Sequence, residues 1–227
     1  MRLNFLAVNL RKNNLNMIIS CDGGAASGKT TGAKMISKKY KLKFLSSGML
    51  YRYASYIILK NKPKNNILFL KKKFKKLNLK KVKKLNLNAQ IISDHTSKIA
   101  KIKKIRDILK TYQINFSKKN KNCIIEGRDI STQILPDSDV KFYFTCDLDV
   151  AAKRRYKELK KNNPSIKLDE VKKSLKLRNI RDKKRKHSPL LKHRDALEIH
   201  TGKLNKKQMI KKMSEHIEKV IKNKYGN

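Results

Sequence analysis

Residues 23–30 read GGAASGKT and match a phosphate-binding pattern of two glycines, a lysine and a threonine at fixed spacing. An apolar run precedes this segment and a helix-like pattern follows it, which is the strand, loop and helix context that the pattern requires. Glycines are needed because backbone N–H groups must turn inward around phosphate oxygens, and the next helix aims its N-terminus at the same anion. We therefore expect a phosphate loop at residues 23–30.

Two side chains of the phosphate loop have expected roles. Lys29 is placed to reach the β and γ phosphates of a nucleotide, and the Thr30 hydroxyl is placed to meet Mg²⁺. The alternative is a glycine-rich turn that arose by chance, which the flanking strand and helix patterns disfavour.

Apolar strand-like runs alternate with amphipathic helix-like segments along the chain. The expected strands are 17–21, 43–45, 123–125, 140–145 and 196–199. The expected helices are 30–40, 48–60, 98–116, 149–161, 169–183 and 206–222. This alternation predicts an α/β fold with a central parallel five-stranded sheet and helical crossovers.

Two segments interrupt the alternation. Residues 61–96 are rich in lysine and asparagine and hold only short apolar pairs, so we expect a small insert with little core of its own. Residues 160–165 contain two asparagines and a proline, which break a helical pattern and predict a mobile flap at about 157–170. We expect a single domain, 17–227, with its core in 17–60 and 97–227, after an N-terminal extension at 1–16.

The sequence composition gives an expectation for the subcellular location of the protein. It has no run of eighteen apolar residues, and its first sixteen residues lack the apolar core and cleavage site of a secretion signal. We expect a cytoplasmic protein with no membrane partner. Cys21, Cys123 and Cys146 are odd in number and lie in or beside apolar runs, which favours reduced thiols over disulfides or a metal site.

The formal net charge of +42 is compatible with nucleic-acid binding, because basic clusters release counterions from phosphate backbones. The lysines are spread along almost every segment, however, without an aromatic RNA-binding signature or zinc-finger spacing. We expect a solvated lysine-rich surface with no specific nucleic-acid partner. A basic nucleic-acid-binding protein remains the alternative.

Arginine is used sparingly, with eleven residues against 48 lysines. Because lysine supplies positive charge elsewhere, arginine is expected where planar, two-pronged binding of phosphate is needed. Eight of the eleven lie in polar, motif-like segments, namely Arg52, Arg106, Arg128, Arg154, Arg155, Arg178, Arg181 and Arg185. Their placement predicts an arginine-lined phosphate site.

Polar residues follow two more of the expected strands. Ser46 and Ser47 open a helix, which indicates either a second anion site or ordinary capping of that helix by a serine. The sequence Glu126-Gly127-Arg128-Asp129 follows a buried strand, at the edge where parallel sheets bind ligands. There Glu126 is placed to hold Mg²⁺ through water, Arg128 to hold phosphate and Asp129 to accept bonds from sugar hydroxyls. A surface turn with an internal ion pair is the alternative.

A late helical segment gathers four charged side chains on one face. Arg178, Arg181, Asp182 and Arg185 are three or four residues apart in sequence. Taken alone, this pattern is typical of a solvated ladder of salt bridges.

Together these segments resemble the bacterial cytidylate kinases, phosphate-loop nucleoside monophosphate kinases that transfer the γ-phosphate of ATP to CMP or dCMP. The resemblance covers almost the whole chain from Met17. It rests on residues 22–31, 47–52, 127–129 with 132 and 136–137, 141–144, 154–156, 178–185, and 188–190 before 195–197. It implies a three-layer P-loop NTPase fold with a small acceptor-binding insert at about 61–96 and a short lid at about 157–170.

The resemblance also implies roles for individual residues. ATP would be bound by Gly23, Gly24, Ala25, Ala26, Ser27, Gly28, Lys29, Thr30 and Thr31. CMP would be bound by Ser47, Tyr51, Arg52, Ser97, Arg106, Arg128, Asp129, Arg178 and Asp182. The transferring phosphoryl group would meet Lys29, Arg128, Arg154, Arg155, Arg181 and Arg185. Mg²⁺ with ATP would be the cofactor, held at Thr30 and Glu126, and a monomer is expected.

Three of these residues would read the base. The amino group of cytosine can donate a hydrogen bond to Asp182. Its N3 and O2 can accept hydrogen bonds from Arg106 and Ser97. Uracil has a carbonyl group in place of this amino group, so the buried acid would face another acceptor and the site would reject uracil. The acceptor choice rests on this trio, and a kinase for UMP, dTMP or AMP is the alternative within the same class.

The chain departs from the family pattern in four respects. Ser46 stands where the family usually has an aspartate. The span between Arg52 and Ser97 is shorter than in the longer members. Ser131 replaces a glycine, and His200 replaces an acid.

Overall fold

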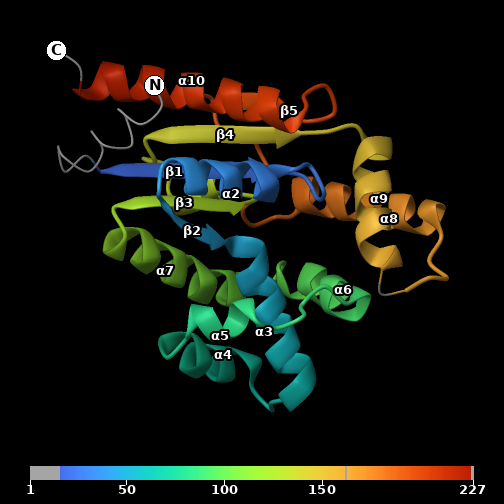
Figure 1. Cartoon of the computed structure of the whole chain (residues 1–227). Coiled ribbons are helices and arrows are strands. Elements are labelled where there is room, and N and C mark those ends of the chain that lie inside the picture. The colour runs from blue at the N-terminus through green and yellow to red at the C-terminus, as the bar shows by residue number, and fades with distance from the viewer. Residues whose placement is uncertain (1–15, 162, 226–227) are drawn as a thin grey trace.

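The computed structural model describes residues 16–161 and 163–225, and a five-stranded sheet lies at its centre (Figure 1). The strands are β1 (Met17–Gly23), β2 (Lys43–Ser46), β3 (Asn122–Gly127), β4 (Val140–Thr145) and β5 (Leu197–His200). They are ordered β2-β3-β1-β4-β5, and each neighbouring pair is parallel. The expected α/β fold with a parallel five-stranded sheet is confirmed.

Helices connect these strands. Those that correspond to expected helices are α2 (Lys29–Lys39), α3 (Ser47–Asn61), α7 (Lys103–Lys119), α8 (Leu148–Lys160), α9 (Leu168–Lys184) and α10 (Lys206–Tyr225). A short π-helix, η1 (Ile130–Ile134), follows β3.

The sheet separates two apolar layers, because successive side chains of a strand point to opposite faces. Ile124 of β3 lies in the layer that includes Ile36 of α2 and Met213 of α10. Its neighbours on the same strand, Cys123 and Ile125, lie in the layer that includes helices α3 and α7. Helices therefore cover both faces, which completes the expected three layers.

The expected helix at 98–116 is wrong at its start. Helix α6 (Gln90–Ile99) ends inside that segment, and Ile102 is extended, with φ −82° and ψ 112°, before α7 begins. The apolar spacing on either side of the break is helical, so periodicity alone did not reveal it. As a result Ser97 and Arg106 lie on different helices.

The insert is more ordered than its composition indicates. It contains α4 (Asn66–Lys75), α5 (Leu79–Lys83) and most of α6. The side chains of Asn65 and Asn78 accept hydrogen bonds from backbone N–H groups at the starts of α4 and α5, so each asparagine is an N-cap. Leu70 and Phe74 of α4 are buried in the same apolar layer as α7. These side chains thus pack into the core of the main body, and the expectation that the insert has little core of its own stays a prediction.

The carboxyl ends of the parallel strands share one edge of the sheet, and helices α6, α8 and α9 stand beyond that edge (Figure 1). Leu159, Val171 and Leu175 pack α8 and α9 together in a small cluster that also includes Ala25 of the phosphate loop. The expected extension at 1–16 falls outside the described residues, apart from Asn16. Among the helices of the described residues, none is long and apolar enough to cross a membrane.

Candidate functional site

The phosphate loop has the backbone that its glycines permit. Gly23 has a φ of +153°, and a Cβ there would lie 2.3 Å from the carbonyl oxygen of Phe144. Gly28 has a φ of +80° and is the N-cap residue of α2, where a Cβ would lie 3.2 Å from Thr201. The loop therefore delivers the N-terminus of α2 to the strand ends, as an anion site requires.

Lys29 is buried at the start of α2. Its Nζ donates to the carbonyl oxygen of Gly24 at 2.8 Å. Burial and the charges of Arg128 and Arg178 lower the pKa of Lys29 to about 7, against an opposing effect of Glu126. A bound polyphosphate would supply the negative charge that stabilises the ammonium form of this buried lysine.

A pocket of about 400 Å³ opens beside the phosphate loop. Its lining includes Ser27, Thr30 and Arg154. Arg154 donates through Nη1 to the Thr201 hydroxyl at 2.8 Å, and that hydroxyl donates to the Ser27 carbonyl at 2.9 Å. The structure thus brings an expected catalytic arginine to the expected ATP-binding loop through Thr201, a residue that the sequence motifs did not mark.

Ser46 has two hydrogen-bonding roles at the end of β2. Its Oγ accepts the backbone N–H of Met49 at 3.1 Å, which makes it the N-cap of α3. The same hydroxyl donates to the Glu126 carboxylate at the end of β3. Ordinary capping is therefore confirmed for Ser46, and a second anion site at this turn stays a prediction.

Thr30 and Glu126 both carry side-chain oxygen atoms, which are the ligand type that suits a magnesium ion. Thr30 lines the loop pocket, and Glu126 is a buried carboxylate close enough to Lys29 to affect its pKa. Mg²⁺ prefers such hard oxygen ligands, and it usually keeps several waters and substrate phosphates with few protein ligands.

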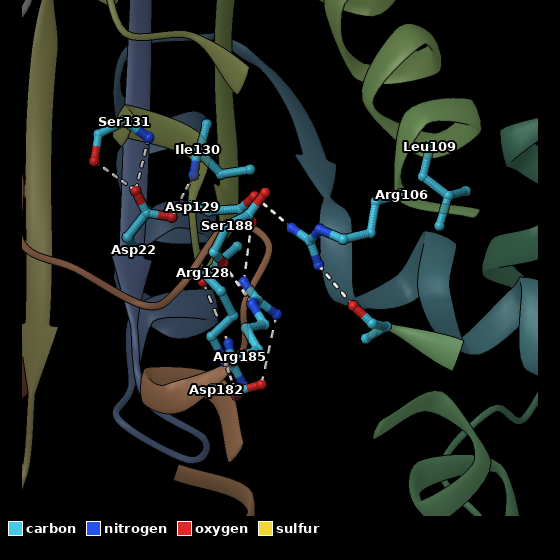
Figure 2. Close-up of polar contacts among 12 residues, drawn as sticks. Asp22, Arg106, Leu109, Arg128, Asp129, Ile130, Ser131, Asp182, Arg185 and Ser188 are labelled. Atoms are coloured by element: carbon cyan, nitrogen blue, oxygen red, sulfur yellow. Dashed lines mark hydrogen bonds and ion pairs between the residues drawn. The ribbon is translucent and has the colours of Figure 1, made fainter. Parts of the chain in front are cut away.

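Arginines and aspartates alternate in a buried network between α7, the turn after β3 and the end of α9 (Figure 2). Arg106 donates to Asp129, and Arg185 Nη2 lies 3.6 Å from Asp129 Oδ1. Arg185 Nη1 lies 3.7 Å from Asp182 Oδ1, and Arg128 Nε donates to Asp182 Oδ2 at 2.9 Å. We call these five residues the arginine–aspartate network.

The network keeps Asp182 ionised. Burial alone would raise the pKa of Asp182, but the charges of Arg128, Arg178 and Arg185 outweigh burial and hold it below its usual range. Arg185 is also buried, with 6% of its side chain exposed. The interpretation of this face as a solvated ladder is therefore wrong for Asp182 and Arg185.

Other expected site residues lie around the network. Arg52 donates to the Leu87 carbonyl at 3.0 Å and to Asn88 Oδ1 at 2.8 Å. The Arg106 guanidinium lies 5.6 Å from the ring centre of buried Tyr51. Ser47 is buried in the first turn of α3.

A second pocket, of about 350 Å³, lies between α6, α8 and α9. Ser97, Arg155, Arg178 and Arg181 line it. Arg181 approaches the Ser97 hydroxyl at 3.4 Å, and Arg155 approaches the Ser93 hydroxyl at 3.5 Å. Of the trio expected to read cytosine, Arg106 and Asp182 are thus in the network, while Ser97 contacts Arg181.

Two further residues of the site were not identified from the sequence. Asp22 accepts hydrogen bonds from the turn that follows β3, and Asn179 Oδ1 accepts the backbone N–H of Ala25 at 3.2 Å. Asp22 had a signal, since it directly precedes the first glycine of the phosphate loop. Asn179 had none, because a polar residue on a polar helix is ordinary.

Comparison with known proteins identifies the family. The family model for cytidylate kinase matches residues 19–219. The cytidylate kinase of Rickettsia canadensis (strain McKiel) is 38% identical over 211 residues, which cover 91% of this chain and 94% of the relative. That of Fusobacterium nucleatum subsp. nucleatum is 37% identical over 220 residues, which cover 90% and 99%.

A looser similarity exists to a solved structure, shikimate kinase from Acinetobacter baumannii in complex with shikimate. It has a TM-score of 0.47 and 14% sequence identity, with 95% of this chain and 98% of that chain covered. From the family model and the sequence relatives, the chain belongs to the cytidylate kinase family.

Proposed function

We propose that this protein transfers the γ-phosphoryl group of ATP to CMP or dCMP and releases ADP with CDP or dCDP. One observation carries the proposal beyond family membership. The phosphate loop and the turn that holds Arg128 and Asp129 follow β1 and β3, which are neighbouring parallel strands. A donor site and an acceptor site at adjacent strand ends suit in-line transfer between two nucleotides.

The ATP half consists of residues 23–31 with Arg154. Backbone N–H groups of the loop bind the phosphates, and Lys29 lies between the donor and the transferring group. Thr30 and, through water, Glu126 would hold Mg²⁺. When bound with ATP, this ion neutralises charge on the β and γ phosphates.

The acceptor half lies between α3, α7 and α9. Ser47, Tyr51, Arg52 and Arg128 would hold the CMP phosphate, and Asp129 with Arg178 would contact the ribose. Arg106, Asp182 and Ser97 would read the base. The low pKa of Asp182 supports this assignment, because an ionised carboxylate can only accept and so favours the amino group of cytosine.

Phosphoryl transfer then requires no nucleophilic side chain and no strong base from the protein. Charge spreads over the equatorial oxygens of the phosphoryl group in the transition state, and fixed cations stabilise it. Lys29, Arg128, Arg154, Arg155, Arg181 and Arg185 would supply these cations, while the lid at about 157–170 would exclude water. We place the enzyme in the cytoplasm as a monomer.

Transfer of label from [γ-³²P]ATP to CMP tests the proposal. Labelled CDP is expected from the wild-type chain. Lys29→Met should lower its formation at least a hundredfold, because the buried cation beside the transferring group is lost. Lys34→Met is the matched control, since Lys34 is exposed on the same helix and should have no effect. Absence of labelled CDP with the wild-type chain would refute the proposal.

A further inference from the structure

Asp22 is a fully buried carboxylate that the transfer chemistry described above does not use. It is the residue before Gly23, and its side chain is 0% exposed. Oδ1 accepts the backbone N–H of Ile130 at 2.8 Å. Oδ2 accepts the backbone N–H of Ser131 at 2.7 Å and its hydroxyl at 2.6 Å. Figure 2 shows these bonds converging on the one carboxylate, beside the arginine–aspartate network.

A short segment after β3 is held by the sheet at one end and by the Asp22 side chain at the other. Within the sheet, Asp22 is in register with Gly127, the last residue of β3. Its side chain holds Ile130 and Ser131, the first residues of η1. Arg128 and Asp129 are the two residues between these points, so their backbone runs from the paired end of β3 to the residues that the Asp22 side chain holds.

We propose that Asp22 is the positioning residue for Arg128 and Asp129, and that it fixes the acceptor-binding turn relative to the ATP-binding loop. This inference rests on the proposed function, in which those two residues bind CMP. Asp22 connects the two halves because its own backbone continues directly into the phosphate loop. No contact with either nucleotide is needed for this role.

The chemistry of the site favours a specific role over simple packing. Burial, with a smaller effect of the Asp129 charge, raises the pKa of Asp22 to about 6, although the bonds from Ser131 and Ile130 oppose the rise. A buried carboxylate costs stability at neutral pH that an apolar side chain would not cost. The ionised carboxylate is retained where three donors converge, which is a pattern that neither an amide nor an apolar side chain can satisfy.

Ser131 adds a side-chain hydrogen bond to this anchor. Its hydroxyl supplies the third donor to Asp22. Ser131→Ala removes that donor and leaves the two backbone bonds in place. Asp22→Asn keeps the size of the side chain but turns an amide N–H₂ toward at least one donor. The two variants therefore weaken the same anchor by different amounts.

Calorimetric titration of each variant with CMP and, separately, with ADP tests the inference. Asp22→Asn should weaken CMP binding about tenfold and Ser131→Ala about threefold, in line with the loss of bonds to a buried charged group. ADP binding should stay within twofold in both. In steady-state assays the KM for CMP should rise while the KM for ATP holds.

Ser20→Ala is the matched control. Ser20 is also fully buried on β1, and it accepts a hydrogen bond at 2.8 Å from the hydroxyl of Ser138, which lies between η1 and β4. It should leave CMP binding unchanged. If Asp22→Asn does not fold, Ser131→Ala and this control decide the question.

Three results would overturn the inference. These are an equal loss of CMP and ADP binding, an unchanged affinity for CMP in the folded variants, and the same CMP loss in Ser20→Ala as in Ser131→Ala. Failure of the proposed function is a separate result, because the wild-type chain would then not phosphorylate CMP.

Discussion

Arginine side chains of the site are held by oxygen atoms of their own chain. Arg106 donates to Asp129 and to the Ala100 carbonyl, Arg154 donates to both oxygens of Thr201, and Arg52 donates to Leu87 and Asn88. A planar guanidinium can make several such bonds at once, whereas an ammonium group is a point charge. This explains why a chain so rich in lysine places arginine at these positions.

Lys29 gives a prediction at this scale. Its pKa of about 7 means that much of the empty enzyme carries a neutral Lys29 at pH 8. Bound triphosphate favours the charged form, so ATP binding at pH 8 should take up protons, by up to about one per site. Calorimetry in two buffers of different ionisation enthalpy measures this uptake. The same uptake in Lys29→Met would contradict the assignment.

Asp182 gives a second prediction. Asp182→Asn retains the volume of the side chain but can present an N–H₂ donor, which suits uracil better than cytosine. We expect the ratio of kcat/KM for CMP over UMP to fall at least tenfold, through a loss with CMP. Asp149→Asn, at an exposed aspartate of α8, is the control and should leave the ratio unchanged. An unchanged ratio in Asp182→Asn would refute this role.

Helix starts show how the elements around the site are secured. Ser46, Asn65 and Asn78 each cap a helix by accepting backbone N–H groups. The two asparagines are solvent-facing caps in the insert, while Ser46 also donates to buried Glu126. The serine at position 46 therefore joins the start of α3 to the end of β3.

This difference predicts that removing the two kinds of cap lowers the free energy of unfolding by unequal amounts. Asn65→Ala should lower the free energy of unfolding by about 1 kcal/mol, the usual loss for a cap. Ser46→Ala should lower it by about 2 to 3 kcal/mol, because it also leaves a buried carboxylate oxygen without its donor. Urea unfolding measures both variants. A smaller loss in Ser46→Ala than in Asn65→Ala would contradict the role of Ser46.

The sequence predicted the elements with strong patterns and missed those defined by local polar contacts. The strand at 140–145 was predicted with the bounds that the structure has, because its apolar residues alternate along a pleated strand. The start of α7 and the helices α4 and α5 were missed. Their ends depend on asparagine caps and on the extended Ile102, which hydrophobic periodicity does not encode.

The same limit applies to the site. Motif spacing predicted which segments gather at the strand ends, since parallel strands share an edge. It could not predict that Arg128 pairs with Asp182 or that Thr201 joins Arg154 to the phosphate loop, because these contacts link residues 47 to 54 positions apart in sequence. The contacts of Asp129 with Arg106 and Arg185 depend on how α7 and the end of α9 pack against the turn after β3, which the sequence pattern does not show.

The whole molecule carries a formal charge of +42, and its lysines are mostly exposed. Such a surface should bind nucleic acid through non-specific ionic contacts. We expect affinity for a labelled DNA duplex to fall at least a hundredfold between 50 and 300 mM salt, without sequence preference. Fluorescence anisotropy measures this dependence. Sequence- or shape-selective binding that persists at the higher salt would favour a nucleic-acid-binding function.

The central claim is that the phosphate loop and the arginine–aspartate network form one site for phosphoryl transfer to a cytidine nucleotide. Its most direct test is kcat/KM from ADP release with MgATP and each of CMP, dCMP, UMP, dTMP and AMP. We expect CMP and dCMP to exceed the other three acceptors by a hundredfold or more. No turnover with CMP and dCMP, or a preference for UMP, dTMP or AMP, would contradict the claim.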